Sequence, residues 1–154
     1  LAVASAQEEI AWTGGGARTS ATGLEPQVAL VVDVTHATDH PGADKKLQGD
    51  HRIGGGPVFS RGSAVHPMVF DLLVECAEAE GIPYTLQAAP HDTGTDADAV
   101  ASAHRGVPTG LISVPNRYMH SPNEMVALED VDRSARLVAA FARRLTPDMD
   151  FIPR

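Results

Sequence analysis

Acidic and imidazole side chains recur at four places where an apolar run of the chain gives way to polar residues. These places are the pair Glu8–Glu9, then Asp33, then the turn Asp92–Asp96, and finally His120. Carboxylate oxygens and imidazole nitrogens are the ligands that zinc and harder divalent cations take in proteins. Two neighbouring acids can also act differently, since one can bind a metal while the other accepts a proton from water. The combination predicts a metal-dependent site, although any one polar turn alone is more often only solvated.

Other catalytic schemes fit the sequence less well. The triplets Gly14–Gly16 and Gly54–Gly56 lack the spacing of dinucleotide loops, and Pro57 leads into an expected strand rather than a helix. The sequence contains no Gly-x-Ser-x-Gly elbow of the kind that serine hydrolases use. Cys76 falls on the apolar face of an expected helix and is interpreted as a core residue. Four histidines without ligand-like spacing are interpreted as surface or packing residues: His36, His40, His51 and His66.

The composition excludes several classes of protein. The 154 residues carry 12 Lys and Arg against 20 Asp and Glu, and the formal net charge is −8. Nucleic acids and anionic membranes are bound by basic faces, so we expect neither as a partner. One cysteine excludes an intrachain disulfide framework and a cysteine-rich zinc site. No apolar run is long enough to cross a bilayer. We therefore expect a cytoplasmic protein with one domain or a large part of one.

Strands and helices are predicted to alternate along the chain. Buried strands are expected at residues 28–32, 57–59, 82–87 and 107–114, and helices at 65–80, 95–104 and 129–145. Residues 35–56 show no periodicity and predict a long loop. Alternation of this kind favours an α/β fold with a mainly parallel sheet in three layers. Because ligands bind beyond the carboxyl ends of such strands, the four polar places are expected to meet at one edge of the sheet.

The ends of the helices carry explicit signals. Gly81 is expected to end the helix at 65–80, and Thr95 is expected to begin the next one. The last helix has acids at its start and arginines at its end, and Pro147 follows it. The buried stripe of this helix is predicted to consist of Val131, Ala135, Val138, Phe141 and Leu145.

The first six residues are small and apolar. Ala4–Ala6 could be the end of a signal peptide, but no basic segment or full apolar stretch precedes it. We interpret residues 1–6 as a buried strand whose neighbours lie upstream. The chain is accordingly expected to be part of a longer protein.

Further motifs follow one another in collinear order over nearly the whole chain. They are Gln7–Ile10, Gly16–Ser20, Val32–Thr35 with Asp39 and Pro41–Gly42, Gly54–Pro57, Gly94–Ala97, Gly106–Thr109, Pro115–Ser121 followed by Glu124, and Asp130–Asp132. Together they resemble the M42 family of dinuclear metallo-aminopeptidases, and the Arg-Tyr-x-His-Ser and Gly-Thr-Asp-Ala elements are the specific ones. The resemblance implies a three-layer α/β/α zinc-peptidase-like fold with a mainly parallel mixed sheet. The chain would be the carboxyl-terminal portion of one catalytic domain.

The resemblance also assigns roles to individual residues. Glu8 would be the general base, Glu9 and His120 would bind one metal ion, and Asp33 would bind the other. The turn formed by Gly94, Thr95 and Asp96 would line the cleft near the substrate. The implied cofactors are two divalent ions per subunit, zinc or cobalt. The implied partners are peptide substrates and further copies of the chain in a homo-oligomer.

Two features depart from the family pattern. The family has two more ligands, a His and a bridging Asp, upstream of its Glu-Glu pair, and residues 1–7 contain neither. The segment between Glu9 and Ala17 is also two residues longer than usual. Three interpretations stay open. The chain is part of an aminopeptidase that removes amino-terminal residues from peptides, part of a deacylase or other amidohydrolase of the same clan, or a non-catalytic fragment without the upstream ligands.

Overall fold

The computed structural model describes residues 1–11 and 13–152. Within these ranges one sheet has the strand order β1–β4–β2–β3, formed by β1 (Ala29–His36), β2 (Val58–Gly62), β3 (Thr85–Ala89) and β4 (Thr109–Asn116). β1 is parallel to β4 and β2 is parallel to β3, while β2 and β4 are antiparallel. The mixed, mainly parallel sheet confirms the predicted fold class.

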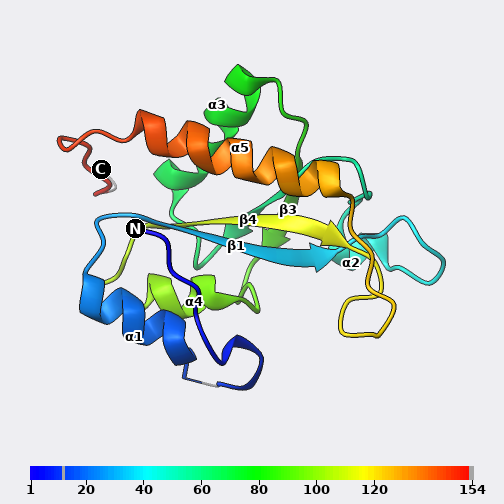
Figure 1. Cartoon of the computed structure of the whole chain (residues 1–154), viewed down its shortest axis with the longest axis horizontal. Coiled ribbons are helices and arrows are strands. Elements are labelled where there is room, and N and C mark those ends of the chain that lie inside the picture. Colours follow the sequence, from blue (N-terminus) through cyan, green and yellow to red (C-terminus); the bar gives the residue numbers. More distant parts are fainter. Residues whose placement is uncertain (12, 153–154) are drawn as a thin grey trace.

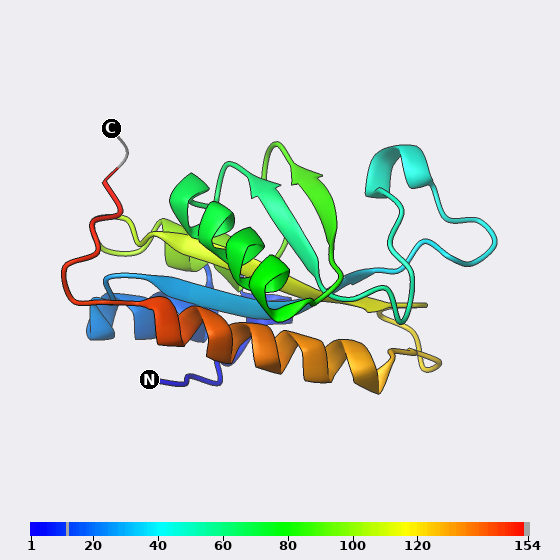
Figure 2. The same cartoon turned by 90° about the horizontal axis from the view of Figure 1, so that it is seen from above.

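Helices cover both faces of the sheet and complete three layers (Figure 1). α3 (Pro67–Glu80) and α5 (Leu128–Arg144) pack on one face, and α1 (Gly15–Leu24) and α4 (Asp96–Ala101) pack on the other. In the view from above, α3 lies beside α5 (Figure 2). Two short helices, η1 (Glu8–Ile10) and α2 (Lys45–Gln48), belong to the connecting segments.

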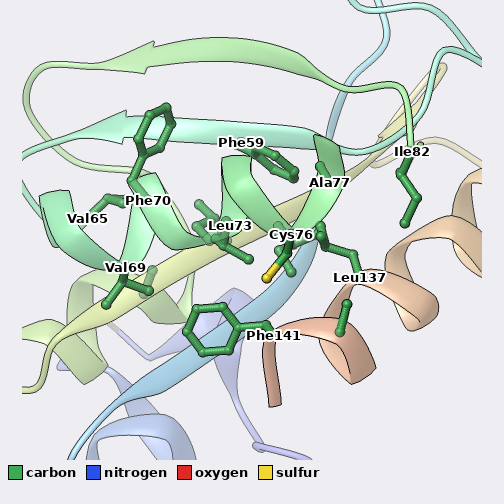
Figure 3. Close-up of a cluster of buried hydrophobic side chains, with 14 residues drawn as sticks. Phe59, Val65, Val69, Phe70, Leu73, Cys76, Ala77, Ile82, Leu137 and Phe141 are labelled. Atoms are coloured by element: carbon green, nitrogen blue, oxygen red, sulfur yellow. The ribbon is translucent and has the colours of Figure 1, made fainter. Parts of the chain in front are cut away.

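The main core lies between α3, α5 and the sheet (Figure 3). Leu73 and Cys76 of α3 and Phe141 of α5 are buried there against Phe59 of β2. Fully burying one large apolar side chain contributes roughly 1.5–3 kcal/mol, so this face supplies much of the stability. Burial also raises the pKa of the Cys76 thiol, which agrees with its interpretation as a core residue.

The helix ends follow the sequence signals. Gly81 ends α3 in the left-handed region, with φ 62°, and its N–H donates back to the helix. The Thr95 hydroxyl accepts a hydrogen bond from the Ala97 N–H and caps α4. Both boundaries confirm the prediction. α1 is absent from the predicted elements, because its Gly, Ala, Thr and Ser residues give no clear apolar period.

The buried face of α5 differs from the predicted one. Leu137, Ala140 and Phe141 are buried, whereas Val131 and Ala135 are exposed. The prediction was correct for Phe141 and wrong for Val131 and Ala135, while Val138 and Leu145 are partly buried against the core. α5 carries apolar residues on two adjoining sides. Packing against α3 and β4 selects one of these sides, which the period of the sequence alone does not distinguish.

The edge of the sheet at β1 is open. β1 pairs with β4 on one side and, within the described ranges, with no strand on its other side. A groove of about 530 Å³ runs along β1 between α1 and α5. Its apolar lining includes Leu24, Leu30, Val32 and Val138, and the Val32 side chain is 53% exposed.

The first residues lie against this groove without forming a strand. Residues 1–6 are exposed and irregular, so the predicted amino-terminal strand was wrong. Their small side chains bury too little apolar surface to offset the entropy of ordering a strand alone. Among the described helices, none is both long and apolar enough to pass through a membrane.

Candidate metal centre

The acidic pair lies on a single turn of 3-10 helix, η1, that rests against α1. Gln7, just before it, has φ 69°, and its carbonyl accepts the Ala11 N–H at 3.0 Å. The Gly16 N–H donates to the Ala6 carbonyl at 2.9 Å and ties the segment to α1. A Cβ at Gly16 would lie 2.6 Å from the Ala6 nitrogen, so this close approach requires glycine. Gly16 therefore lets the segment before Glu8 and Glu9 pack closely against α1.

His120 reaches the acidic pair from the loop after β4. Its Nε2 lies 3.2 Å from Oε1 of Glu9, a contact between residues 111 positions apart. Both side chains are exposed, at 65% for His120 and 69% for Glu9. The backbone of His120 has φ 63°, in the left-handed region that non-glycine residues seldom adopt. Residues in such rare backbone conformations cluster at functional sites, where the contacts around them hold the strained conformation in place.

Asp33 lies inside β1, paired with Ser113, rather than at the end of the strand as the sequence suggested. The strand continues for three more residues because Val34, Thr35 and His36 keep pairing with β4. Oδ1 of Asp33 accepts a hydrogen bond from the Val34 N–H at 2.7 Å. Burial raises the pKa of Asp33, and the charges of Asp96 and Glu9 raise it further.

Glu8 belongs to the same electrostatic group. Burial raises the pKa of Glu8, followed by repulsion from Asp33, Glu9 and Asp96, while His120 lowers it. Within the described part of the chain, no Lys or Arg forms an ion pair with any of these four carboxylates. Acids that face one another without a cation are a donor set suited to a divalent metal.

The side chains expected to bind metal are not arranged in a ready-made coordination group. Across residues 1–11 and 13–152, no three His, Cys, Asp or Glu side chains come together as a potential metal site. The donors therefore fit a metal by type and by charge. Among the expected donors in the described residues, Glu9 and His120 are the pair in direct contact.

The Gly-Thr-Asp turn lies next to Glu8. Asp98 accepts hydrogen bonds from the Thr93 and Gly94 N–H groups at 3.0 Å and holds the turn. Glu8, Gly94, Thr95 and Asp96 line one polar cavity of about 360 Å³. The structure thus places the expected base and the expected substrate residues around the same space.

The remaining histidines take no part in this group. His51 is buried, and its Nδ1 lies 2.8 Å from the Thr85 hydroxyl, so it packs between loop and sheet. The ring of His40 contacts Tyr118, and that of His66 meets Phe151 edge-on. These contacts agree with their interpretation as packing or surface residues.

Several residues around the site have contacts that the sequence pattern does not reveal. Arg117 donates two hydrogen bonds to Asp39, at 2.7 and 2.8 Å, and holds the pKa of that carboxyl below its usual range. Asn116 and Glu124 hydrogen-bond to each other beside His120. All four residues belong to the motifs quoted in the sequence analysis, and this was the signal that could have found them. A motif does not show, however, which residues contact one another.

Comparison with known proteins gives consistent results. The sequence matches the family described as M42 glutamyl aminopeptidase over residues 1–137. It is 37% identical to the lysyl aminopeptidase of Pyrococcus furiosus over 151 residues, which cover 98% of this chain and 42% of that protein.

Solved structures agree. An aminopeptidase from the archaeon Desulfurococcus kamchatkensis is 41% identical, with a TM-score of 0.84 over 94% of this chain and 41% of that one. The TET1 peptidase of Pyrococcus horikoshii, described as assembling into a tetrahedron or a large octahedral shell, is 27% identical, with a TM-score of 0.68 over 89% of this chain and 39% of that one.

The chain spans about two fifths of the length of these relatives, at 39–42%. The family match nevertheless extends from the first residue through most of α5. This match over most of the chain shows that the chain belongs to the M42 glutamyl aminopeptidase family.

Proposed function

We propose that the chain is the carboxyl-terminal portion of the catalytic domain of a metal-dependent aminopeptidase, which removes amino-terminal residues from peptides in the cytoplasm. Membership of the M42 family and the aminopeptidase relatives support the reaction class. The observation that carries the site assignment is the 3.2 Å contact between Glu9 and His120, which joins two segments that lie 111 residues apart in the sequence.

The proposed roles follow from position and charge. Glu9 and His120 would hold one divalent ion, zinc or cobalt, and Asp33 would hold a second. Bound there, the two ions would polarise the scissile carbonyl and lower the pKa of water. The repulsion among Glu8, Asp33 and Asp96 supports this assignment, because added positive charge would relieve it.

Glu8 would move the proton. Its carboxylate would accept a proton from the attacking water and deliver it to the departing amine. The cavity between Glu8 and the turn at Gly94, Thr95 and Asp96 would receive the amino-terminal end of the peptide. Cleavage of the peptide bond then releases a free amino acid and a peptide shortened by one residue.

Self-association is part of the proposal. The related TET1 peptidase of Pyrococcus horikoshii is described as assembling into large closed shells. We propose that the protein carrying this chain likewise forms a homo-oligomer, with peptides as its substrates.

The test uses the full-length protein that contains this chain. Glu8→Gln should lower kcat on aminoacyl anilides by roughly 10²–10⁴-fold, because it removes a proton acceptor. Its metal content, measured by mass spectrometry, should stay at the wild-type value of about two ions per subunit. Glu78→Gln, an exposed change on α3, is the matched control and should alter neither quantity.

Specific outcomes would contradict the assignment. Loss of both metals from Glu8→Gln would show that the roles of Glu8 and Glu9 are reversed. Full activity in metal-free protein would exclude the mechanism. Cleavage of N-acyl amino acids in place of aminoacyl anilides would identify a deacylase instead.

A further inference from the structure

The loop that carries His120 is closed at its base but has a demanding backbone. The N–H and carbonyl groups of Arg117 and Met125 exchange two hydrogen bonds, at 2.9 and 3.1 Å. Between them both Tyr118 and His120 have positive φ, at 58° and 63°. Because side chains with a Cβ seldom adopt this conformation, the loop needs a further contact to keep it.

One carboxylate provides that contact. Oε1 of Glu124 accepts the His120 backbone N–H at 2.5 Å, and its Oε2 accepts a hydrogen bond from Nδ2 of Asn116 at 3.3 Å. Asn116 is the last residue of β4 and is only 2% exposed. Glu124 therefore links the backbone of His120 to a fixed point of the sheet.

We infer that Glu124 is a positioning residue of the candidate metal centre, which acts by fixing the backbone of His120 and hence the direction of its imidazole. This inference rests on the proposed function, in which His120 is a metal ligand. Neither the sequence pattern nor the family resemblance gave Glu124 a role. Residues that orient a ligand in this way usually change metal affinity when they are altered.

At position 124, the length of the side chain and its charge can be tested separately. Asn116 Oδ1 is buried and has no hydrogen-bond partner among the residues that the structure describes. A glutamine at 124 keeps the length of the side chain, so its oxygen still accepts the His120 N–H. Because Nδ2 of Asn116 faces position 124, the glutamine amide donates to Oδ1 of Asn116 once the Asn116 amide group turns over. An aspartate keeps the charge but is one methylene shorter, so it cannot span both partners.

The experiment compares Glu124→Gln with Glu124→Asp in the full-length protein. Zn²⁺ affinity should stay within about 2-fold of wild type in E124Q and fall about 10–100-fold in E124D. Hydrogen exchange of the His120 amide, followed by mass spectrometry on metal-free protein, should be accelerated in E124D and unchanged in E124Q. The exposed Glu78 supplies matched controls, E78Q and E78D, which should change neither readout.

The opposite ranking, with E124D close to wild type and E124Q impaired, would overturn the inference by showing that charge matters and the hydrogen bonds do not. Wild-type affinity and exchange in both variants would overturn it too. Failure of the proposed function gives a different result: wild-type protein, or His120→Ala, would then show no His120-dependent Zn²⁺ binding. If the proposed function fails in this way, the exchange rate of the His120 amide still decides whether Glu124 fixes the His120 backbone.

Discussion

Two sets of carboxylates in this molecule have opposite surroundings. Asp39 and Asp130 are neutralised, the first by Arg117 and the second by Arg133 together with the N–H groups of Gly54 and Gly56. Glu8 and Asp33 instead face other carboxylates, which raise their pKa values beyond the effect of burial. Asp33 and Asp39 are only six residues apart. The contrast shows that the partners of an acid, and not its place in the sequence, separate a structural carboxylate from one available for a ligand.

The largest effect is expected at Asp130. This side chain is fully buried and accepts hydrogen bonds from Gly54 and Gly56 at 2.7 and 2.9 Å. Asp130→Ala leaves two N–H groups without their acceptor, while Arg133 keeps its contacts with Glu129 and the Gly54 carbonyl, so the change should cost about 3 kcal/mol of unfolding free energy. Urea denaturation of wild type and variant measures this change in unfolding free energy. The exposed neighbour Asp132→Ala is the control and should stay within about 0.5 kcal/mol of wild type.

An intermediate effect is expected at Asp33. In metal-free protein, Asp33→Asn should leave the unfolding free energy equal or higher, because it removes a half-buried charge that other carboxylates repel. Zn²⁺ at about 100 times its Kd should stabilise wild type by about 2.7 kcal/mol and the variant by less. Two results together would contradict this prediction: a lower unfolding free energy for the metal-free variant, and a stabilisation by Zn²⁺ as large as that of wild type. Asp33 would then resemble the neutralised carboxylates Asp39 and Asp130.

The smallest effect is the pH dependence contributed by Asp39. The hydrogen bond from Arg117 lowers its folded pKa below the ordinary value of 3.8. Its stabilising contribution is therefore present above that value and is lost as the pH falls through the lowered folded pKa. Asp39→Asn should be less stable than wild type near neutral pH, and the two curves should converge in acid. A constant difference down to the acid limit would contradict this, and Asp132→Asn serves as the reference.

The sequence predicts the fold best where local signals are strong. The apolar period and Gly81 locate α3, and the unbroken run of apolar residues at 28–32 locates most of β1. The same reasoning misplaces the buried side of α5, since the choice between its two apolar sides depends on packing against α3. It also ends β1 too early, because Asp33 is polar but remains paired with β4.

The site is only partly accessible from the sequence. Polar residues after apolar runs indicate the edge of the sheet, and motif resemblance singles out Glu9 and His120. The bonds of Glu124 and Arg117 depend on how two loops meet, and no periodicity records that. The left-handed backbone at His120 is equally hidden, since most histidines have negative φ and the contacts of the loop decide the exception.

In the part of the chain that the structure describes, one side of β1 has no strand beside it, and this has a practical consequence. Its free backbone groups and the exposed Val32 form a template onto which another extended strand can add. If these 154 residues are produced alone, we expect them to self-associate through this strand and to precipitate at high concentration. A lysine at position 32, which places a charge on that rim, is the simplest way to keep such a preparation in solution.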